Sequence, residues 1–249
     1  MTVVVPEPWS RDLLLLTDLP RWDVEEVHGS AAGVLLRIRG RRGTSLVGVG
    51  EPEAVVALAR EHGPAAAPRW MTVPRGAAEL LGEADLAALG LETRTDWDWF
   101  LTTSAPAPQT AESLVVALDR EAELAQIQDC LAEANPRSDA RPDLPSHWLG
   151  VRGEGDRLVG VVSATEEGGP RPGTVSWHLQ GLGVRPEARG RALGKALIAA
   201  ATRRGLAVLP QDSWVSLGMY ADNDPARRIY DALGFVTHTR NSSFRTVTA

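Results

Sequence analysis

Apolar residues recur at two spacings along the chain, and each spacing predicts a different kind of element. The short apolar runs LLRI at 35–38 and SLVGVG at 45–50 flank a Gly-containing turn at 40–43, which predicts a β-hairpin. Residues 95–103 alternate tryptophan with aspartate, a pattern that predicts a strand with one apolar face. The N-terminal half is therefore expected to contain several strands.

One helix and one linker complete the expected N-terminal half. Residues 52–62 carry apolar side chains at helical spacing, and Gly63-Pro64 is expected to end that helix. The segment SAPAPQTAES at 104–113 lacks any apolar period and indicates a linker. The chain is thus expected to form an N-terminal α+β domain at 1–103 and a larger domain at 114–249.

The larger half contains a longer series of expected elements. Strands are predicted at 114–118, 147–152, 157–165, 175–184, 213–221 and 234–243. Helices are predicted after Asp119 up to Asn135-Pro136, from about Ala192 to 203–205, and at 225–233. Antiparallel strands come first and a strand–helix–strand–helix run follows, an order that predicts an α/β fold of the α+β type, with a mixed sheet and helices on its faces.

Composition narrows the class of protein. The 249 residues carry a formal net charge of −6 without a long basic face, which argues against a nucleic-acid partner. The single cysteine, Cys130, allows no intramolecular disulfide and indicates a reducing compartment. The longest apolar run, at 13–16, is too short for a bilayer, and the N-terminus shows no signal-peptide pattern. We expect a cytoplasmic protein with no membrane partner.

The segment RPEARGRALGKAL at 185–197 joins a predicted strand, which ends at Val184, to a predicted helix. Backbone N–H groups at a helix start point outward and attract anions. Glycines and basic residues alternate in this segment: Arg189, Gly190, Arg191, Gly194 and Lys195. Two interpretations fit the local features, a backbone cradle for a pyrophosphate and an ordinary charged helix start.

Two sequence blocks resemble the GNAT superfamily of acyl-CoA-dependent N-acyltransferases. VRPEARGRALG at 184–194 resembles the family's strand ending in Val-x-Pro, followed by Arg/Gln-x-x-Gly-x-Gly/Ala at a helix start. Ala192 stands in place of the first motif glycine, a change that we expect to be tolerated. VSLGMYADNDPARRIYDALGF at 215–235 resembles the family's strand–Asn–helix–Tyr–Gly-Phe segment. The resemblance covers roughly 114–244 and implies a GNAT-like acyl-CoA-binding fold, with the N-terminal half as a degenerate GNAT-like half.

The resemblance also implies roles for individual residues. Leu182, Gly183 and Val184 at the strand end would offer backbone groups to the acyl carbonyl and the pantetheine arm of acetyl-CoA. Asn223 would bind the pantetheine region, and Tyr230 would protonate the leaving thiolate. The pyrophosphate would be held by the backbone N–H groups of Arg189, Gly190, Arg191, Ala192, Leu193, Gly194 and Lys195.

The second block also has a structural interpretation. Asp224 and Pro225 are typical of an N-cap and a first helical residue, which would leave Asn223 free for a ligand. Tyr230 lies beside an apolar stripe of the same predicted helix and would otherwise be a packing residue. The resemblance favours acid catalysis, a role that the tyrosine hydroxyl permits.

The general base has several candidates. His178 lies six positions before Val184 on the same predicted strand, and its imidazole could accept a proton from an ammonium directly or through water. A hydrogen-bonded structural histidine is the alternative. Glu166 and Glu167, at the end of a neighbouring strand, are further candidates, with a solvated turn as the alternative. Cys130 lies on a predicted helix and is expected to be structural rather than a nucleophile.

The N-terminal half shows no phosphate loop, metal-ligand spacing or nucleophile elbow in its sequence. We expect it to pack against the catalytic half and to wall off the acceptor groove. Trp97, Trp99 and Phe100 either lie at that junction or fill the N-terminal core.

The leading prediction is an acetyl-CoA-dependent N-acetyltransferase that acts on a small-molecule or peptide amine, as a monomer or homodimer and without a metal. Direct transfer requires a neutral amine, a polarised thioester carbonyl and a proton for the departing thiolate. A catalytically silent acyl-CoA-binding sensor is an alternative from another class. A scaffold with a vestigial fold, which would bind no coenzyme, is the third.

Overall fold

The computed structural model describes residues 4–40 and 43–246, which belong to two compact units. Unit 1 comprises Met1–Trp99, Met219–Asp222 and Thr237–Ala249, and unit 2 comprises Phe100–Gly218 and Asn223–Val236. Both units combine a sheet with helices, which confirms the predicted mixed α/β class. Within the described ranges, every helix is too short or too polar to cross a membrane.

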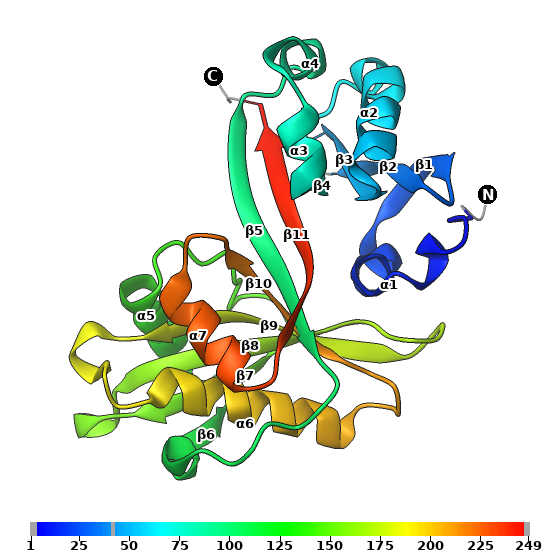
Figure 1. Cartoon of the computed structure of the whole chain (residues 1–249). Coiled ribbons are helices and arrows are strands. Elements are labelled where there is room, and N and C mark those ends of the chain that lie inside the picture. The colour runs from blue at the N-terminus through cyan, green and yellow to red at the C-terminus, as the bar shows by residue number, and fades with distance from the viewer. Residues whose placement is uncertain (1–3, 41–42, 247–249) are drawn as a thin grey trace. The chain divides into compact units, whose positions relative to one another are not determined.

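The described residues of unit 1 form a mixed sheet accompanied by helices (Figure 1). Its strands follow the spatial order β1 (Asp23–Ser30), β2 (Gly33–Gly40), β3 (Gly43–Gly50), β4 (Trp70–Pro74), β11 (Val236–Arg245) and β5 (Thr93–Thr102). Its helices are α1 (Leu13–Asp18), α2 (Pro52–Ala66), α3 (Arg75–Leu80) and α4 (Glu83–Leu89). The antiparallel β2–β3 pair confirms the predicted hairpin, and residues 41 and 42 of its turn at 40–43 lie outside the described residues.

Helix α2 extends beyond the residues that were expected to end it. It continues through Gly63-Pro64 to Ala66, with Pro64 in its last turn. Gly63 lies so close to Leu89 that a Cβ atom there would come within 2.3 Å of Leu89 Cδ2. The glycine therefore allows the close contact between α2 and the end of α4. The helix ends at Ala67, which has a left-handed backbone with φ of 44°.

The last strand of the chain completes the sheet of unit 1. β11 pairs antiparallel with β4, from Asn241↔Pro74 to Arg245↔Trp70. The compact unit that holds most of 1–103 therefore also takes in the C-terminal residues from Thr237 on, which the sequence had suggested as part of 114–249. Because β11 and β4 are far apart in the sequence, no local pattern shows that the C-terminal residues belong to unit 1.

Unit 2 contains the second sheet segment, and its expected strands and helices are all present within a few residues. The strands follow the order β10 (Val215–Tyr220), β9 (Val175–Val184), β8 (Leu158–Gly168), β7 (His147–Arg152) and β6 (Val115–Leu118). The helices are α5 (Leu124–Ala134), α6 (Leu193–Val208) and α7 (Asp224–Ala232). Helices α5 and α6 cover opposite faces of this sheet (Figure 1).

Each unit contains two parallel strands that pair over only part of their length. In unit 2, β9 pairs with β10 from Trp177↔Val215 to Leu179↔Leu217 only, although β9 continues to Val184. In unit 1, β3 likewise pairs with β4 at Ser45–Val47 only. A helix connects the two strands in both cases, α6 in unit 2 and α2 in unit 1. Parallel strands that stop pairing at their carboxyl ends leave an opening where α/β folds bind ligands.

The expected linker at 104–113 is docked on α6 within unit 2. It leads into a 3-10 helix at Thr110–Leu114. Arg203 of α6 forms an ion pair with Glu112 and donates a hydrogen bond from Nη1 to the Pro106 carbonyl oxygen over 3.2 Å. The other carboxylate oxygen of Glu112 accepts from the Gln109 backbone N–H over 2.6 Å. These contacts hold the segment against α6 as an ordered part of unit 2.

Candidate active site

The open end of β9 begins at a β-bulge. Residues 161 and 163 of β8 lie opposite residues 183 and 180 of β9, so that β9 carries one extra residue. Gly181 has a φ of +67°, a left-handed conformation that glycine adopts without steric cost. Beyond Leu179 the edge of β9 that faces away from β8 has no ladder with β10. Leu182, Gly183 and Val184 therefore form the strand end that the sequence predicted as the acyl and pantetheine site.

Two side chains hold the carbonyl groups of this strand end. Asn135 Nδ2 donates to the Leu182 carbonyl oxygen over 3.0 Å, and Arg189 Nε donates to the Val184 carbonyl oxygen over 3.0 Å. Asn135 had been interpreted only as a helix end, because nothing local marks a partner 47 residues away. Since a carbonyl oxygen has two lone pairs, Val184 can accept from Arg189 and from a ligand amide together.

Two glycines near the strand end allow neighbouring elements to lie closer than a side chain would permit. A Cβ atom on Gly183 would lie 2.8 Å from the Ala134 Cβ atom at the end of α5. Gly194, in the first turn of α6, lies beside Val184 and Ile229, whose side-chain atoms would be 3.7 and 3.8 Å from an added Cβ. Gly194 thus places the start of α6 next to both the strand end and α7.

The segment between β9 and α6 has the form expected of a cradle. Gly190 and Ala192 both have left-handed backbones, with φ of +76° and +56°, and both are exposed together with Arg191. Ala192 is the N-cap of α6, in agreement with the predicted helix start. A left-handed backbone costs a residue with a Cβ about 1 kcal/mol, which explains physically why glycine suits this position.

The basic side chains of the segment divide into structural and available groups. Arg185 is fully buried, where it pairs with Asp129 and Glu133 of α5 and donates Nε to the Leu158 carbonyl oxygen over 2.8 Å. It anchors the segment instead of facing a ligand. Within the described part of the chain, Arg191 and Lys195 form no ion pair, so their charges are available to an anion.

Tyr230 is 7 % exposed and packs within unit 2 against Phe100 and Phe235, with ring centroids 5.8 and 6.0 Å away. Burial raises the pKa of its phenol to about 12. The hydroxyl therefore keeps its proton throughout the neutral range and acts as a donor. Packing and acid catalysis are therefore compatible roles for Tyr230, because a packed ring also fixes the direction of its hydroxyl.

The predicted assignment of the α7 cap is wrong. Asn223, not Asp224, is the N-cap, and its Oδ1 accepts a hydrogen bond from the Ala226 backbone N–H over 3.2 Å. Asp224 is the first helical residue, followed by Pro225. Asparagine and aspartate cap equally well, and so local preference could not distinguish two adjacent candidates. One lone pair of the side-chain oxygen Oδ1 of Asn223 is thus used by the helix, and its second lone pair and the Nδ2 donors remain for the proposed coenzyme contact.

His178 lies in the paired part of β9, four positions before Leu182. Its Nδ1 is 2.9 Å from Ser216 Oγ of β10, and the register also places it opposite Thr165 of β8. Four strand residues span about 13 Å, a distance that a water relay covers better than direct contact. The side chain is half-buried.

Glu166 and Glu167 lie at the far end of the sheet from the strand end. They are opposite Trp177 and Ser176, because β8 and β9 run antiparallel. At about 3.3 Å per residue, each lies more than ~20 Å along the strand from Val184. On the same scale His178 lies about 20 Å from Val184, so the register places both glutamates only slightly farther from the strand end than His178, and their role as the base stays a prediction. Glu166 instead contacts His147, whose Nε2 is 3.3 Å from its carboxylate.

Cys130 is buried on α5 among apolar residues, and that burial raises the pKa of its thiol. A thiol that resists ionisation is a poor nucleophile, in line with the structural role expected from the sequence.

The corresponding junction in unit 1 has different chemistry. Strand β3 leads through the single residue Glu51 into α2, which has Pro52 at its first position and Glu53 in its first turn. Proline removes a backbone donor, and the two carboxylates repel anions. This helix start is therefore unsuited to a pyrophosphate.

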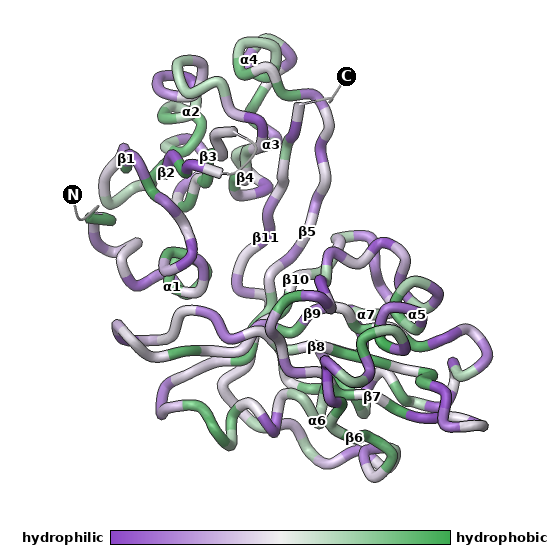
Figure 2. The backbone as a smooth tube through the Cα atoms, turned by 180° about the vertical axis from the view of Figure 1, so that it is seen from behind, coloured by the Kyte–Doolittle hydropathy of each residue, from purple (hydrophilic) through white to green (hydrophobic). Residues whose placement is uncertain are grey.

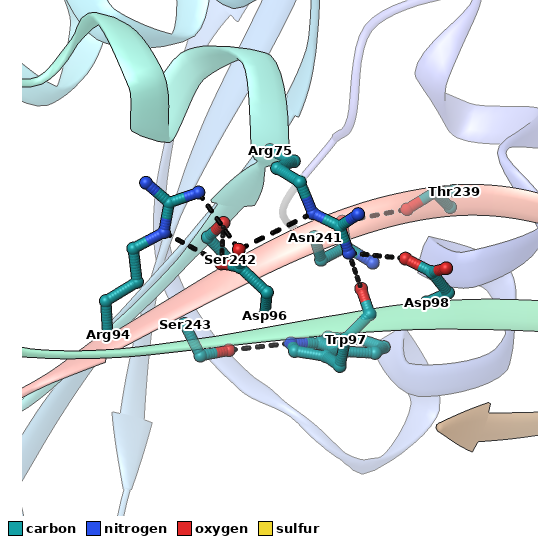
Figure 3. A network of polar contacts seen from close by, with 9 residues as sticks. All are labelled: Arg75, Arg94, Asp96, Trp97, Asp98, Thr239, Asn241, Ser242 and Ser243. Atoms are coloured by element: carbon teal, nitrogen blue, oxygen red, sulfur yellow. Dashed lines mark hydrogen bonds and ion pairs between the residues drawn. The ribbon is translucent and has the colours of Figure 1, made fainter. Parts of the chain in front are cut away.

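Unit 1 instead holds a polar network between β5 and β11. Both strands are mostly hydrophilic (Figure 2). Figure 3 shows Arg75, at the start of α3, paired with Asp98 and donating to the Trp97 carbonyl oxygen. Asp98 is only 1 % exposed, so a charged side chain of this strand is buried as well as its apolar ones. The guanidinium of Arg75 compensates the buried charge.

Asp96 links the same network to its neighbours. Burial raises the pKa of Asp96, but hydrogen bonds from Arg94 and Ser242 outweigh it and hold that pKa below the usual value. Trp97 Nε1 donates to Ser243 Oγ over 2.8 Å. Trp99 is buried in unit 1, in agreement with packing in the N-terminal core, whereas Phe100 is buried in unit 2 and so does not fill that core. Their place at a junction stays a prediction.

Comparison with known proteins agrees with this geometry. The profile of the acetyltransferase (GNAT) family matches residues 113–235. These residues form a GNAT acetyltransferase domain. The match begins at the docked linker and ends after α7, so it contains the strand end, the cradle and Tyr230.

Relatives of the chain are similar in fold more than in sequence. A protein from Novosphingobium aromaticivorans assigned to the GNAT family has 21 % identity and a TM-score of 0.57, with 97 % of this chain and 100 % of that one covered. A GCN5-related N-acetyltransferase from Kribbella flavida has 16 % identity and a TM-score of 0.59, with 100 % and 98 % covered. Both likenesses extend the fold agreement beyond the GNAT domain to nearly the whole chain.

A curated relative is similar over a short region. The mycothiol acetyltransferase of Streptomyces coelicolor is 42 % identical over 69 residues, which are 27 % of this chain and 21 % of that protein. The match thus spans about a fifth of the relative's length.

Proposed function

We propose that the protein is an acetyl-CoA-dependent N-acetyltransferase that transfers the acetyl group directly to an amine of a small molecule or peptide. One observation carries the proposal. β9 leaves β10 after Leu179, passes through a bulge at Gly181, and leads directly into the exposed cradle at Gly190–Ala192. The thioester arm of the coenzyme requires unpaired backbone groups at a strand end, and its pyrophosphate requires a helix start that follows them closely.

The cradle would hold the anionic part of the coenzyme. Its exposed backbone at Gly190–Ala192 precedes α6, whose unpaired N–H groups and positive dipole end favour a pyrophosphate. Lys195 adds a full charge in the first turn. The backbone groups of Leu182–Val184 would bind the pantetheine arm and polarise the thioester carbonyl.

His178 and Tyr230 would move the protons. His178, oriented through Nδ1 by Ser216, would take the proton of the acceptor ammonium through water. Tyr230 would donate a hydrogen bond to the departing thiolate. Because burial raises its pKa to about 12, the phenol stabilises the thiolate mainly as a neutral donor, and solvent completes the protonation.

The comparisons support acetyl transfer more than any acceptor. The match to a mycothiol acetyltransferase covers too small a share of that protein to extend its acceptor to this chain. A net charge of −6 is compatible with a cationic amine. The acceptor class thus stays a small-molecule or peptide amine.

The coenzyme half of the proposal is tested by calorimetric titration of acetyl-CoA. We expect a dissociation constant near micromolar, equivalent to about −8 kcal/mol. Lys195→Glu should weaken binding by roughly tenfold or more, because it reverses a charge beside the pyrophosphate. Arg204→Glu, an equal reversal on an exposed residue at the far end of α6, is the matched control and should bind as wild type.

The transfer half is tested by thiol release from acetyl-CoA over a panel of primary amines. His178→Gln and Tyr230→Phe should each lower turnover by about 10²-fold or more while acetyl-CoA still binds. Tight coenzyme binding without transfer to any amine would replace the enzyme by the silent sensor. Absence of coenzyme binding would contradict both and leave a vestigial scaffold.

A further inference from the structure

Gln180 is the polar side chain of β9 nearest to the strand end. It lies directly before the bulge at Gly181 and two residues before Leu182, about 7 Å along the strand. His178, the proposed base, lies about twice as far from Leu182 on the same scale. Neither the coenzyme site nor the proposed proton transfer uses Gln180, although it lies between the base and the thioester site in the strand.

Gln180 and His178 share one face of the sheet. Trp177 faces α6, because a Cβ atom added to Gly205 of that helix would lie 2.8 Å from Trp177 Cε3. Side chains alternate along a strand, so those of His178 and Gln180 lie on the opposite face. An amine that reaches the strand end along this face therefore meets Gln180 closer to the thioester than His178.

Contacts with β8 fix the carboxamide of Gln180. Its Nε2 donates a hydrogen bond to Thr165 Oγ1, and Ser163 Oγ donates to its backbone carbonyl oxygen over 3.0 Å. Because Nε2 is held, Oε1 is the available end of the carboxamide, and no donor among the described residues reaches it. The half-buried side chain thus presents a fixed, uncharged hydrogen-bond acceptor.

An uncharged acceptor suits an amine that must attack in its neutral form. The amine has a single lone pair, and an N–H bond held by Gln180 Oε1 directs that pair toward the carbonyl carbon. As the N–C bond forms, the C–S electron pair leaves on sulfur, which solvent protonates, and the nitrogen becomes positive. A primary amine then has two N–H groups, one for Gln180 and one whose proton passes through water to His178. A secondary amine has one N–H group and must give up one of these contacts.

We propose that Gln180 binds the acceptor amino group and makes the protein selective for primary over secondary amines. The inference rests on the proposed function, because it requires the thioester at Leu182–Val184. The carboxamide contacts the amine alone, so coenzyme binding does not depend on it. Because Gln180 carries no charge, its hydrogen bond is the same at every pH at which the amine is neutral.

The test measures thiol release from acetyl-CoA with primary amines and their N-methyl derivatives, such as benzylamine and N-methylbenzylamine. Gln180→Leu should lower kcat/KM about tenfold for the primary amine and about twofold or less for the secondary one, the size expected for one neutral hydrogen bond. Thr165→Val releases the carboxamide and should lower the preference for the primary amine roughly threefold or more. Gln128→Leu, an equal change at an exposed position of α5, should leave both rates unchanged.

The outcomes separate a substrate contact from a structural role. Equal losses for both amines in Gln180→Leu, or weaker acetyl-CoA binding by that variant in calorimetric titration, would overturn the inference, because the residue would then only support the strand. If Gln180→Leu does not fold, an unchanged preference in Thr165→Val overturns it instead. Equal turnover of both amine classes by wild type would also overturn it and leave the proposed function intact. Absence of transfer from wild type to every amine would contradict the proposed function itself, and the inference with it.

Discussion

Asn135 Nδ2 donates a hydrogen bond to the Leu182 carbonyl oxygen over 3.0 Å. The bond joins the C-cap of α5 to the open end of β9, directly after the bulge at Gly181. The position of the strand end therefore depends on a residue outside both sequence blocks that resemble the GNAT family.

Replacement of Asn135 by alanine should loosen the strand end. We expect the free energy of unfolding to fall by about 1 kcal/mol, because the half-buried carbonyl loses its donor. Acetyl-CoA should bind several-fold more weakly, since Leu182 is no longer held. Chemical denaturation and calorimetric titration measure the two effects. Gln128→Ala, on an exposed position of α5, should change neither, and a wild-type affinity for Asn135→Ala would contradict the positioning role.

Ala192→Gly should relieve the left-handed backbone at the start of α6. We expect stabilisation of up to about 1 kcal/mol, reduced by the larger entropy of glycine in the unfolded chain. Thermal unfolding checks this. Ala207→Gly places the same change at an exposed position of regular helix and should destabilise by up to about 1 kcal/mol. Equal signs for the two variants would contradict the strain at Ala192.

Arg185→Met should destabilise the protein substantially. The variant removes a fully buried guanidinium that serves Asp129, Glu133 and the Leu158 carbonyl oxygen. We expect a loss of roughly 2–4 kcal/mol, toward the lower end because both carboxylates can reach water. Urea denaturation measures it. Arg157→Gln is the matched control, because that half-exposed arginine also pairs with Glu133 and should cost less than about 1 kcal/mol. Similar losses would mean that burial is not decisive.

Tyr230 should make the protein less stable as the pH rises from 10 to about 12. Its pKa is raised from 10.0 to about 12 by burial, so in this window the folded state retains a proton that the unfolded state has lost. The free energy of unfolding contributed by this group is therefore complete below pH 10 and falls by roughly 2–3 kcal/mol across the window. Denaturation at several pH values, with Tyr230→Phe as the reference, isolates the contribution.

The ionisation itself can be followed separately. The chain has two tyrosines, so a Tyr220→Phe variant leaves Tyr230 as its single tyrosine. Tyrosinate absorbance in that variant should appear with a midpoint near pH 12. A midpoint at or below 10 would show that the phenol meets water and would remove the basis for a fixed neutral donor.

The features that could be predicted from the sequence are those whose causes are local. The strand ending at Val184, the helix start at Ala192 and the charges between them occupy one short segment, so residue types alone predict an exposed basic junction between a strand and a helix. The β2–β3 hairpin and the elements of unit 2 follow from apolar spacing in the same way. The N-cap of α7 is an exception. Asparagine and aspartate are equally favourable N-cap residues, so residue preference could not show that Asn223 rather than Asp224 caps this helix.

The features that could not be predicted join residues far apart in the chain. The alternation of residues 95–103 predicts a strand with one apolar face, but it contains no sign that Arg75 lies beside the buried Asp98 in the fold. Glu166 seems close to the strand end until the antiparallel register places it opposite Trp177. Such placements depend on which strands become neighbours, and a spacing rule that considers one segment at a time contains no information about this.

The place of β11 determines when each unit can be completed during synthesis. This strand is made last, yet it lies between β4 and β5 of unit 1. At about 5–20 residues per second, roughly 7–30 s pass between the emergence of the end of β5 and the end of β11. Unit 2 receives its last residue, Val236, before then. Of the two units, the one whose synthesis starts first is therefore the one whose last strand is synthesised second.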